Sequence, residues 1–207
     1  RSPSLWNTAY EGFSINTQMI AIDVSQKNFS YMYSLLKSDP NFLGGAIAAP
    51  HKEIAATLCN QFVTPEAKHI GAINCLFRNE EGSLCGTNTD GEGSLVAFES
   101  IYGDFENKRI LILGIGGTGK AVAGYFVSRL QNSDQLILVS RSSSARKLSD
   151  KIKCKNLDWS KMNKELFEVD VIINCTTLGS AFDPGKSPIP KKYINKLRDD
   201  IFIYDVV

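Results

Sequence analysis

A glycine-rich segment carries the clearest chemical signal in the sequence. Residues 114–119 read Gly-Ile-Gly-Gly-Thr-Gly, directly after an apolar run and directly before a helix-forming segment. Glycines with this G-x-G-x-x-G spacing allow a tight turn and let backbone N–H groups approach a pyrophosphate, whose charge the N-terminus of the next helix stabilises. We therefore predict a dinucleotide site; the alternative is a glycine-rich turn that binds nothing. Its residues are Gly114, Gly116, Gly117, Thr118 and Gly119.

The residues after the next apolar run indicate which dinucleotide binds. That run ends in Val139-Ser140-Arg141-Ser142, and no Asp or Glu follows before Asp150. An acidic side chain here would hold the ribose 2′-hydroxyl of NAD and repel a 2′-phosphate, whereas a guanidinium and hydroxyls bind a phosphate. We predict NADP, with Ser140 and Arg141 as contacts and Arg146 as a second cation. A solvated loop arginine is the alternative.

A lysine and an aspartate are candidates for proton transfer. Pro50 at a first helical position would place Lys52 in the first turn, near the positive end of the helix dipole. This unfavourable position for a cation suits a lysine that must exchange a proton. Thr89-Asp90-Gly91-Glu92 has the spacing of a capping box, with Thr89 as N-cap and Asp90 as the first helical residue. Asp90 could pair with a lysine, although each residue alone is also common as a structural one.

The first hundred residues alternate between strand-like and helix-like segments. Interleaved strands and helices predict an α/β domain with a mainly parallel sheet. A helix over 89–102 follows and ends at Gly103. The strand-like segments are 18–25, 43–49, 72–79 and 83–88, the last two flanking a turn at Glu80–Gly82, and the helix-like segments are 28–39 and 50–62.

A second alternation after Gly103 predicts a Rossmann-type dinucleotide-binding domain. Its segments are 109–114, 117–130, 135–140, 142–152, 169–177, 191–197 and 201–207. We place the boundary in the charged stretch that begins at Gly103. Residues 1–103 then form a substrate-binding catalytic domain, and residues 104–207 form the NADP-binding domain.

Five separate motifs, in order and spacing, resemble the shikimate dehydrogenase family over nearly all of the chain. They are GGAIAAPHKE (44–53), IGAINCL (70–76), GTNTDGEG (86–93), LILGIGGTGKA (111–121), and INCTTLGS (173–180) followed by YDVV (204–207). The resemblance implies an NADP-dependent oxidoreductase that interconverts 3-dehydroshikimate and shikimate by hydride and proton transfer.

The resemblance also implies roles for individual residues. Lys52 and Asp90 match the catalytic pair of the family, and Asn74 matches an asparagine that contacts the substrate. Ser2, in Ser2-Pro3, matches a serine near the substrate carboxylate. The loop that contains Thr176 and Leu178 matches one beside the nicotinamide.

The chain departs from the family pattern at the substrate site. A substrate-binding threonine is replaced by Ala48, and Ala46 replaces a second polar residue; Trp6 and Cys75 are further departures. The alternatives are therefore the same chemistry on quinate or aminoshikimate, or a catalytically silent regulatory module with this fold. A short-chain dehydrogenase would need Tyr-x-x-x-Lys after the glycine loop. The pair Tyr33 and Lys37 precedes it, and we interpret that pair as exposed on a helix.

Composition limits the partners. The 207 residues are 43% apolar and 22% charged with a net charge of +1, which argues against nucleic acid or a membrane as partner. Residues 1–103 carry 6 basic and 10 acidic groups and residues 104–207 carry 17 and 12, so a phosphorylated ligand suits the second half. We expect a small-molecule substrate and a monomer or homodimer.

Cysteine usage and the chain ends complete the expectations. Five cysteines without a C-x-x-C pair, and two separated histidines, predict reduced structural thiols, no metal site and a cytoplasmic location. The chain begins at Arg1 and ends within an apolar run, so we expect residues to be missing at both ends.

Overall fold

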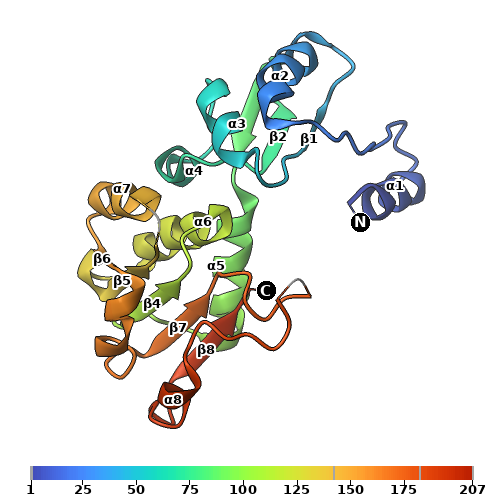
Figure 1. Ribbon diagram of the computed structural model, residues 1–207. Helices are drawn as coiled ribbons and strands as arrows, with labels where there is room; N and C mark the ends of the chain where they lie inside the picture. The colour runs from blue at the N-terminus through green and yellow to red at the C-terminus, as the bar shows by residue number, and fades with distance from the viewer. Residues whose placement is uncertain (1, 142, 182, 207) are drawn as a thin grey trace.

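Two separate sheets organise the computed structural model, which describes residues 2–141, 143–181 and 183–206 (Figure 1). Ser142 and Val207, which belong to two of the motifs above, lie outside the described residues. The α-helices are α1 (Ser2–Gly12), α2 (Phe29–Ser38), α3 (Lys52–Leu58), α4 (Pro65–Ile70), α5 (Thr89–Tyr102), α6 (Gly117–Phe126), α7 (Ser143–Ile152) and α8 (Lys191–Ile194). The strands are β1 (Gly44–Ala46), β2 (Cys75–Arg78), β3 (Leu84–Thr87), β4 (Ile110–Leu113), β5 (Leu136–Val139), β6 (Lys155–Leu157), β7 (Val171–Asn174) and β8 (Phe202–Asp205).

The sheet of the N-terminal unit differs from the mainly parallel sheet predicted for it. Its three strands run in the order β1-β2-β3, and both pairs are antiparallel. Residues 18–25, predicted as a strand, have no regular secondary structure, so they add no parallel neighbour. The short turn at Glu80–Gly82 imposes the direction of β2 and β3, because a tight hairpin can join only antiparallel strands. Helices α2 and α3 pack on this sheet through Phe29, Tyr33 and Ala55.

The second sheet confirms the predicted Rossmann-type unit. Its five strands are all parallel, in the order β6-β5-β4-β7-β8. Strands β4, β5 and β7 are buried on both faces, as parallel strands covered on both sides must be. Helices α5, α6 and α7 contribute to the core on one face. The strand order reverses between β4 and β7, and ligands bind beyond the carboxyl ends of strands at such a point.

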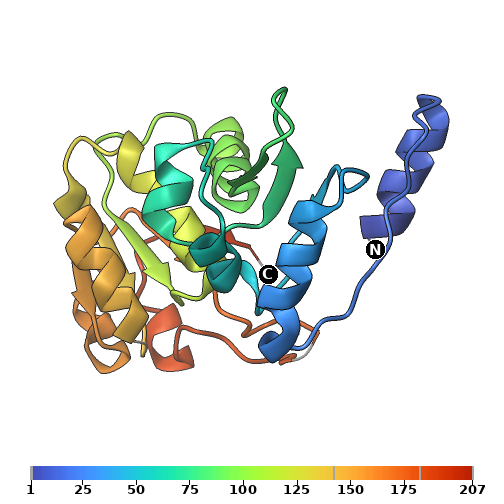
Figure 2. The same ribbon diagram turned by 90° about the horizontal axis from the view of Figure 1, so that it is seen from above.

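Helix α5 connects the two units (Figure 1), and in the view from above it runs roughly along the line of sight (Figure 2). Its C-terminal half packs on the parallel sheet, where Phe98 contacts the rings of Phe126, Phe202 and Tyr204. Its first turn is pressed against α6: a Cβ on Gly91 would lie 2.5 Å from the carbonyl oxygen of Ala121. The division of the chain at Gly103 stays a prediction. Among the described residues, no helix combines the length and apolar character needed to cross a membrane.

Candidate active site

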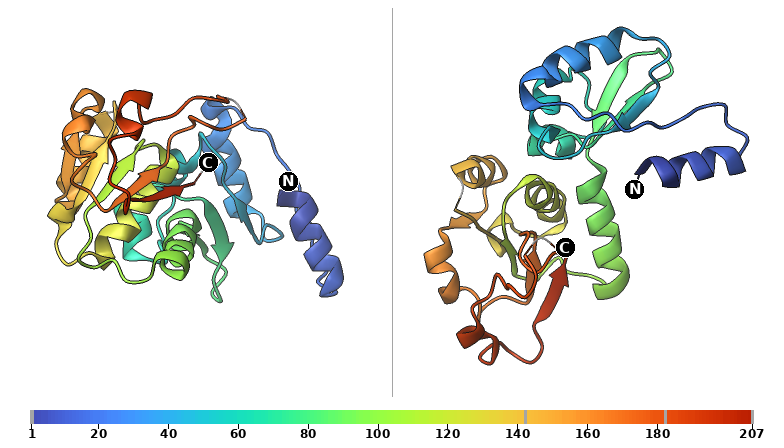
Figure 3. Two further views of the ribbon diagram at one scale, coloured as in Figure 1. Left: turned by 90° about the horizontal axis from the view of Figure 1, so that it is seen from below. Right: turned by 45° about the vertical axis from the view of Figure 1, so that its right-hand side comes forward.

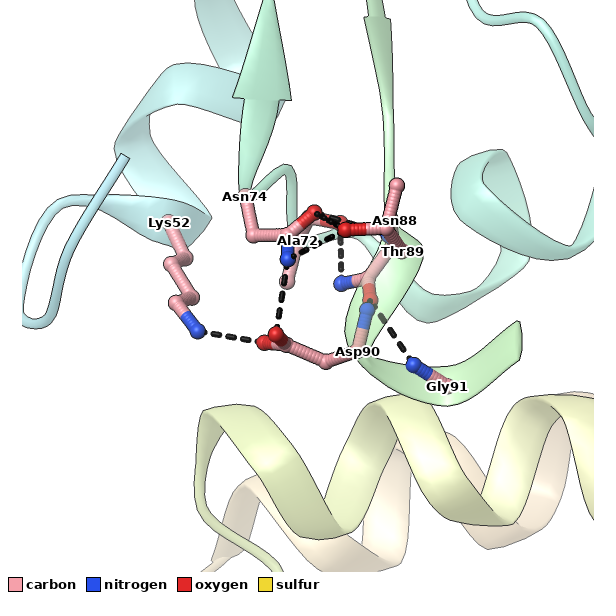
Figure 4. Close-up of polar contacts among 7 residues, drawn as sticks. All are labelled: Lys52, Ala72, Asn74, Asn88, Thr89, Asp90 and Gly91. Atoms are coloured by element: carbon pink, nitrogen blue, oxygen red, sulfur yellow. Dashed lines mark hydrogen bonds and ion pairs between the residues drawn. The ribbon is translucent and has the colours of Figure 1, made fainter. Parts of the chain in front are cut away.

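Lys52 and Asp90 meet as an ion pair between the first turns of two helices. The Lys52 Nζ pairs with Oδ2 of Asp90, and their side chains are 18% and 29% exposed (Figure 4). The amide of Asn74 donates to the other carboxylate oxygen, Asp90 Oδ1, at 2.7 Å. The carboxylate is thus held from both sides, and it fixes the ammonium group at a position that solvent still reaches. Such an arrangement presents a proton donor of defined position.

The bounds of α5 are as predicted, but its N-cap was predicted incorrectly. Asn88, and not Thr89, is the N-cap: its Oδ1 accepts hydrogen bonds from the backbone N–H groups of Asp90 at 3.1 Å and Gly91 at 3.3 Å. Its Nδ2 donates to the carbonyl of Ala72 at 3.0 Å, and the side chain is fully buried. Thr89 is the first helical residue, and its hydroxyl accepts a bond from Asn74 at 3.0 Å. The cap therefore ties the start of α5, with Asp90, to the segment before β2.

Helix α3 also begins later than predicted. Pro50 is not its first helical residue, because the chain turns between Ala48 and His51, where the His51 N–H donates to the Ala48 carbonyl at 3.0 Å. His51 is the N-cap and Lys52 the first residue. The prediction that Lys52 lies in the first turn is confirmed.

The predicted nucleotide-binding residues gather at the carboxyl edge of the parallel sheet. Gly114 follows β4, Ser140 and Arg141 follow β5, and Thr176 follows β7. Arg141 is exposed, as is Arg146 on α7. The Ser140 N–H donates to the Leu157 carbonyl at 3.3 Å, which fixes the start of this loop.

The glycine loop has the shape of a backbone cradle. A Cβ on Gly119 would lie 2.0 Å from the carbonyl oxygen of Gly114, so the loop closes on itself at this point. Gly114 has φ +87°, and a side chain there would meet Thr176 at 2.7 Å. A Cβ on Gly116, in contrast, would meet nothing within 4 Å. Open space above an unsubstituted backbone at a helix N-terminus fits a pyrophosphate.

Hydrogen bonds fix the loop after β7. Oδ1 of the buried Asn174 accepts bonds from the Thr176 backbone N–H at 3.0 Å and hydroxyl at 2.7 Å. The Thr176 hydroxyl accepts from the Leu178 N–H at 3.1 Å. Cys175 lies between Asn174 and Thr176 in the chain. Burial, and to a lesser extent the carboxylate of Asp205, raise the pKa of its thiol to about 12. Cys175 is therefore protonated at neutral pH and is no nucleophile.

The ion pair of Lys52 and Asp90 lies beside the glycine loop of residues 114–119. The Lys52 Cδ is 3.7 Å from the position that a Cβ on Gly117 would take. The Lys52 side chain therefore lies next to the glycine loop, and the ion pair with Asp90 lies where the two units meet.

Two other candidates are placed elsewhere. Ser2 opens α1, which has no buried residue and stands apart from both sheets in two further views (Figure 3). Among the described residues, no hydrogen bond joins Ser2 to Lys52, Asp90 or Asn74, and its contact with substrate stays a prediction. Tyr33 is buried, contrary to our interpretation of an exposed pair with Lys37, and burial raises its pKa to about 12. Such a tyrosine is unsuited to proton transfer.

Four residues that support the site were missed by the sequence analysis. Asn88 was not singled out, although an asparagine directly before a predicted helix start is a cap signal. Asn174, the last residue of β7, was not singled out either. Glu53 and Lys120, which pair with each other across the two units, carry no local signal.

Family models and known proteins match the chain along most of its length. The model of the shikimate dehydrogenase substrate-binding domain matches residues 1–76, and that of shikimate/quinate 5-dehydrogenase matches residues 97–182. A shikimate dehydrogenase (NADP(+)) of Methanocaldococcus jannaschii is 31% identical over 100% of this chain and 73% of its own length. The crystal structure of Thermus thermophilus shikimate 5-dehydrogenase in complex with NADP(H) and shikimate is 27% identical with a TM-score of 0.77, covering 100% of this chain and 73% of that one.

One solved structure with another activity has the same fold. The 5-ketofructose reductase of a Gluconobacter strain matches 99% of this chain and 73% of its own with a TM-score of 0.78. Its identity of 24% shows likeness of fold alone.

Proposed function

The chain belongs to the shikimate dehydrogenase family, and from this premise we propose that it is an NADP-dependent oxidoreductase that reversibly reduces 3-dehydroshikimate to shikimate. The observation that carries the proposal is the ion pair of Lys52 and Asp90 beside the glycine loop. A small ring substrate suits this place, because Asn74 and Lys52 offer polar groups next to the nucleotide cradle. We further propose a place in the shikimate pathway.

Residues of the chain donate and accept the proton. Bound NADPH supplies the hydride, and NADP⁺ accepts it in the reverse direction. Lys52 donates a proton to the substrate oxygen as the carbonyl becomes a hydroxyl, and its positive charge stabilises the developing alkoxide. Asp90 holds the lysine in place, and Asn74 orients Asp90 through the 2.7 Å hydrogen bond. In oxidation Lys52 takes the proton back.

The glycine loop and the ends of β5 and β7 supply the proposed cofactor contacts. The backbone of residues 114–119 would bind the pyrophosphate, and Ser140, Arg141 and Arg146 the 2′-phosphate. The loop carrying Thr176 and Leu178 would lie beside the nicotinamide.

Substitution of Arg141 by alanine should affect the binding of NADP⁺ and of NAD⁺ differently. Losing one charge-assisted hydrogen bond to a phosphate is expected to weaken NADP⁺ binding by about 1–3 kcal/mol and leave NAD⁺ binding nearly unchanged. Titration calorimetry with both cofactors measures this, and NAD⁺ is the internal control. Equal loss for both would show that Arg141 only supports the loop or stacks on adenine.

The direct test of the proposed function is turnover. The protein is assayed with NADP⁺ and, separately, shikimate, quinate and aminoshikimate, following absorbance of the reduced cofactor. Shikimate turnover that disappears in Asp90→Asn supports the proposal. Turnover of quinate or aminoshikimate alone would select the alternative substrate, and no turnover of any would favour a silent module.

Two alanines beside Asn74 determine the expected substrate preference. Ala46 pairs with Cys75 in the sheet, and both Ala46 and Ala48 are exposed. A site that hydrogen-bonds a substrate hydroxyl discriminates strongly against analogues that lack it, whereas an apolar wall discriminates weakly between them. We therefore predict a shikimate KM above the ordinary range, that is above about 1 mM, with better turnover of a ring bearing a bulkier or less polar group.

The restoring variant is Ala48→Thr, alone and with Ala46→Asn. One added hydrogen bond is expected to raise kcat/KM for shikimate about three- to tenfold. Ala48→Val, which has the shape of threonine without the hydroxyl, is the control and should give no gain. An ordinary KM in the unmodified protein, with no improvement from threonine, would contradict this interpretation of the alanines.

The state of the cysteines bears on the location of the protein. All five cysteines are free thiols, which is typical of a reducing compartment, and we propose that the protein is cytoplasmic. A monomer or homodimer remains the expectation for its assembly.

A further inference from the structure

An ion pair next to the proposed site joins the two units. The Lys120 Nζ donates to Glu53 Oε1 at 2.6 Å. Glu53 directly follows Lys52 on α3, and Lys120 directly follows the glycine loop on α6. The pair therefore ties the first turn of the helix that carries Lys52 to the first turn of the helix that the loop opens.

Burial of the lysine distinguishes this pair from an ion pair between two exposed side chains. The Lys120 side chain is 8% exposed and that of Glu53 is 58% exposed. A buried ammonium group is costly unless it is paired, so removing Glu53 leaves an uncompensated charge. A lysine directly after a glycine loop reaches phosphates in some nucleotide-binding proteins. Here its Nζ is engaged by Glu53.

Helix α6 fixes the positions of both members of the catalytic pair. Asp90 is fixed through α5, where Gly91 approaches the carbonyl oxygen of Ala121 so closely that a side chain is excluded. Lys52 lies on α3, which is joined to α6 by the ion pair of Glu53 with Lys120. The Lys52 side chain also lies next to Gly117, the first residue of α6. Without the ion pair, α3 could shift relative to α6, and Lys52 would lose its place against Asp90.

We propose that Glu53 and Lys120 are positioning residues, which hold Lys52 against Asp90 and transmit nucleotide binding at the glycine loop to α3. The kinetic part of this inference rests on the proposed function. Neither residue needs to touch the substrate.

Hydrogen exchange tests the coupling without any assay of turnover. The amide exchange of α3 is measured with and without NADP⁺ in the unmodified protein, in Glu53→Gln, in Lys120→Met and in the double variant. NADP⁺ is expected to slow exchange in α3 at least threefold in the unmodified protein and to have no such effect in the variants, while the Kd for NADP⁺ changes less than threefold. The double variant carries no unpaired buried charge, so it keeps the test decisive if Glu53→Gln does not fold.

Kinetics provide the second readout. Each variant is expected to lose about tenfold in kcat with a change in the shikimate KM below threefold, and the double variant should lose no more than the singles because the two residues act as a unit. Glu99→Gln is the matched control. It removes the ion pair of Glu99 with Arg129, whose N–O distance is 3.3 Å and whose arginine side chain is exposed. This variant should change neither kcat nor the amide exchange of α3.

Four results would overturn the inference. In hydrogen exchange, these are an α3 that NADP⁺ does not protect in the unmodified protein, or equal protection of α3 in the folded variants. In kinetics, it is a variant kcat within twofold of that of the unmodified enzyme. In cofactor binding, it is a large loss of NADP⁺ affinity in Lys120→Met, which would assign the lysine to phosphate binding. Failure of the unmodified protein to oxidise shikimate would contradict the proposed function instead, and the exchange experiment would still decide the coupling.

Discussion

Replacing Lys52 by methionine is expected to lower kcat by about two orders of magnitude or more while the affinity for NADP⁺ changes little. Methionine keeps an unbranched apolar stem next to Gly117 but removes the ammonium group that pairs with Asp90. Proton transfer to the substrate oxygen and stabilisation of the alkoxide are both lost. The measurement is kcat at saturating shikimate and NADP⁺, together with a fluorescence titration of the cofactor.

Lys37→Met is the matched control for this variant. Lys37 is an exposed lysine on α2, and its replacement should leave kcat unchanged. A Lys52→Met protein that retains most of its kcat would remove Lys52 from the proposed mechanism. A parallel loss of cofactor affinity would instead place the lysine in nucleotide binding.

Gly116→Ala is expected to weaken NADP⁺ binding about ten- to a hundredfold, or about 1.4–2.8 kcal/mol, without loss of thermal stability in the absence of cofactor. Gly116 has φ −82° and ψ −162°, an extended conformation that alanine adopts without strain, and its added methyl group would meet no protein atom within 4 Å. That methyl group would occupy the space into which the pyrophosphate must come. The variant therefore separates the role of this glycine in binding from any role in folding.

The measurements are a cofactor titration and a thermal melt of the apo protein. Gly93→Ala is the control, because Gly93 lies on α5 and a Cβ there would also meet nothing within 4 Å. It should preserve NADP⁺ affinity. If Gly116→Ala also binds NADP⁺ normally, the cradle does not receive the pyrophosphate and the cofactor lies elsewhere.

Local signals in the sequence determined the nucleotide-binding half and the chemistry of the site. Apolar runs bounded by turns predicted β4, β5 and β7, and these strands are buried on both faces. Helix α5 was predicted with its observed bounds, because its apolar spacing and the following glycine are local features. Lys52 and Asp90 were identified by their positions at two helix starts and Asn74 by the resemblance to the family, and the structure brings all three together.

Tertiary structure decided what depends on contacts between distant segments. The short turn at Glu80–Gly82 is a local signal for the antiparallel pair β2–β3, but the pairing of β1 with β2 joins distant segments, and period and composition do not specify a strand's neighbour. The choice of Asn88 over Thr89 as N-cap depends on a hydrogen bond to Ala72, 16 residues earlier. The pairing of Glu53 with Lys120 spans 67 residues and exists only because α3 and α6 are packed together. The sequence specifies the type of each side chain, but its hydrogen-bond or ion-pair partner is determined only when the chain has folded.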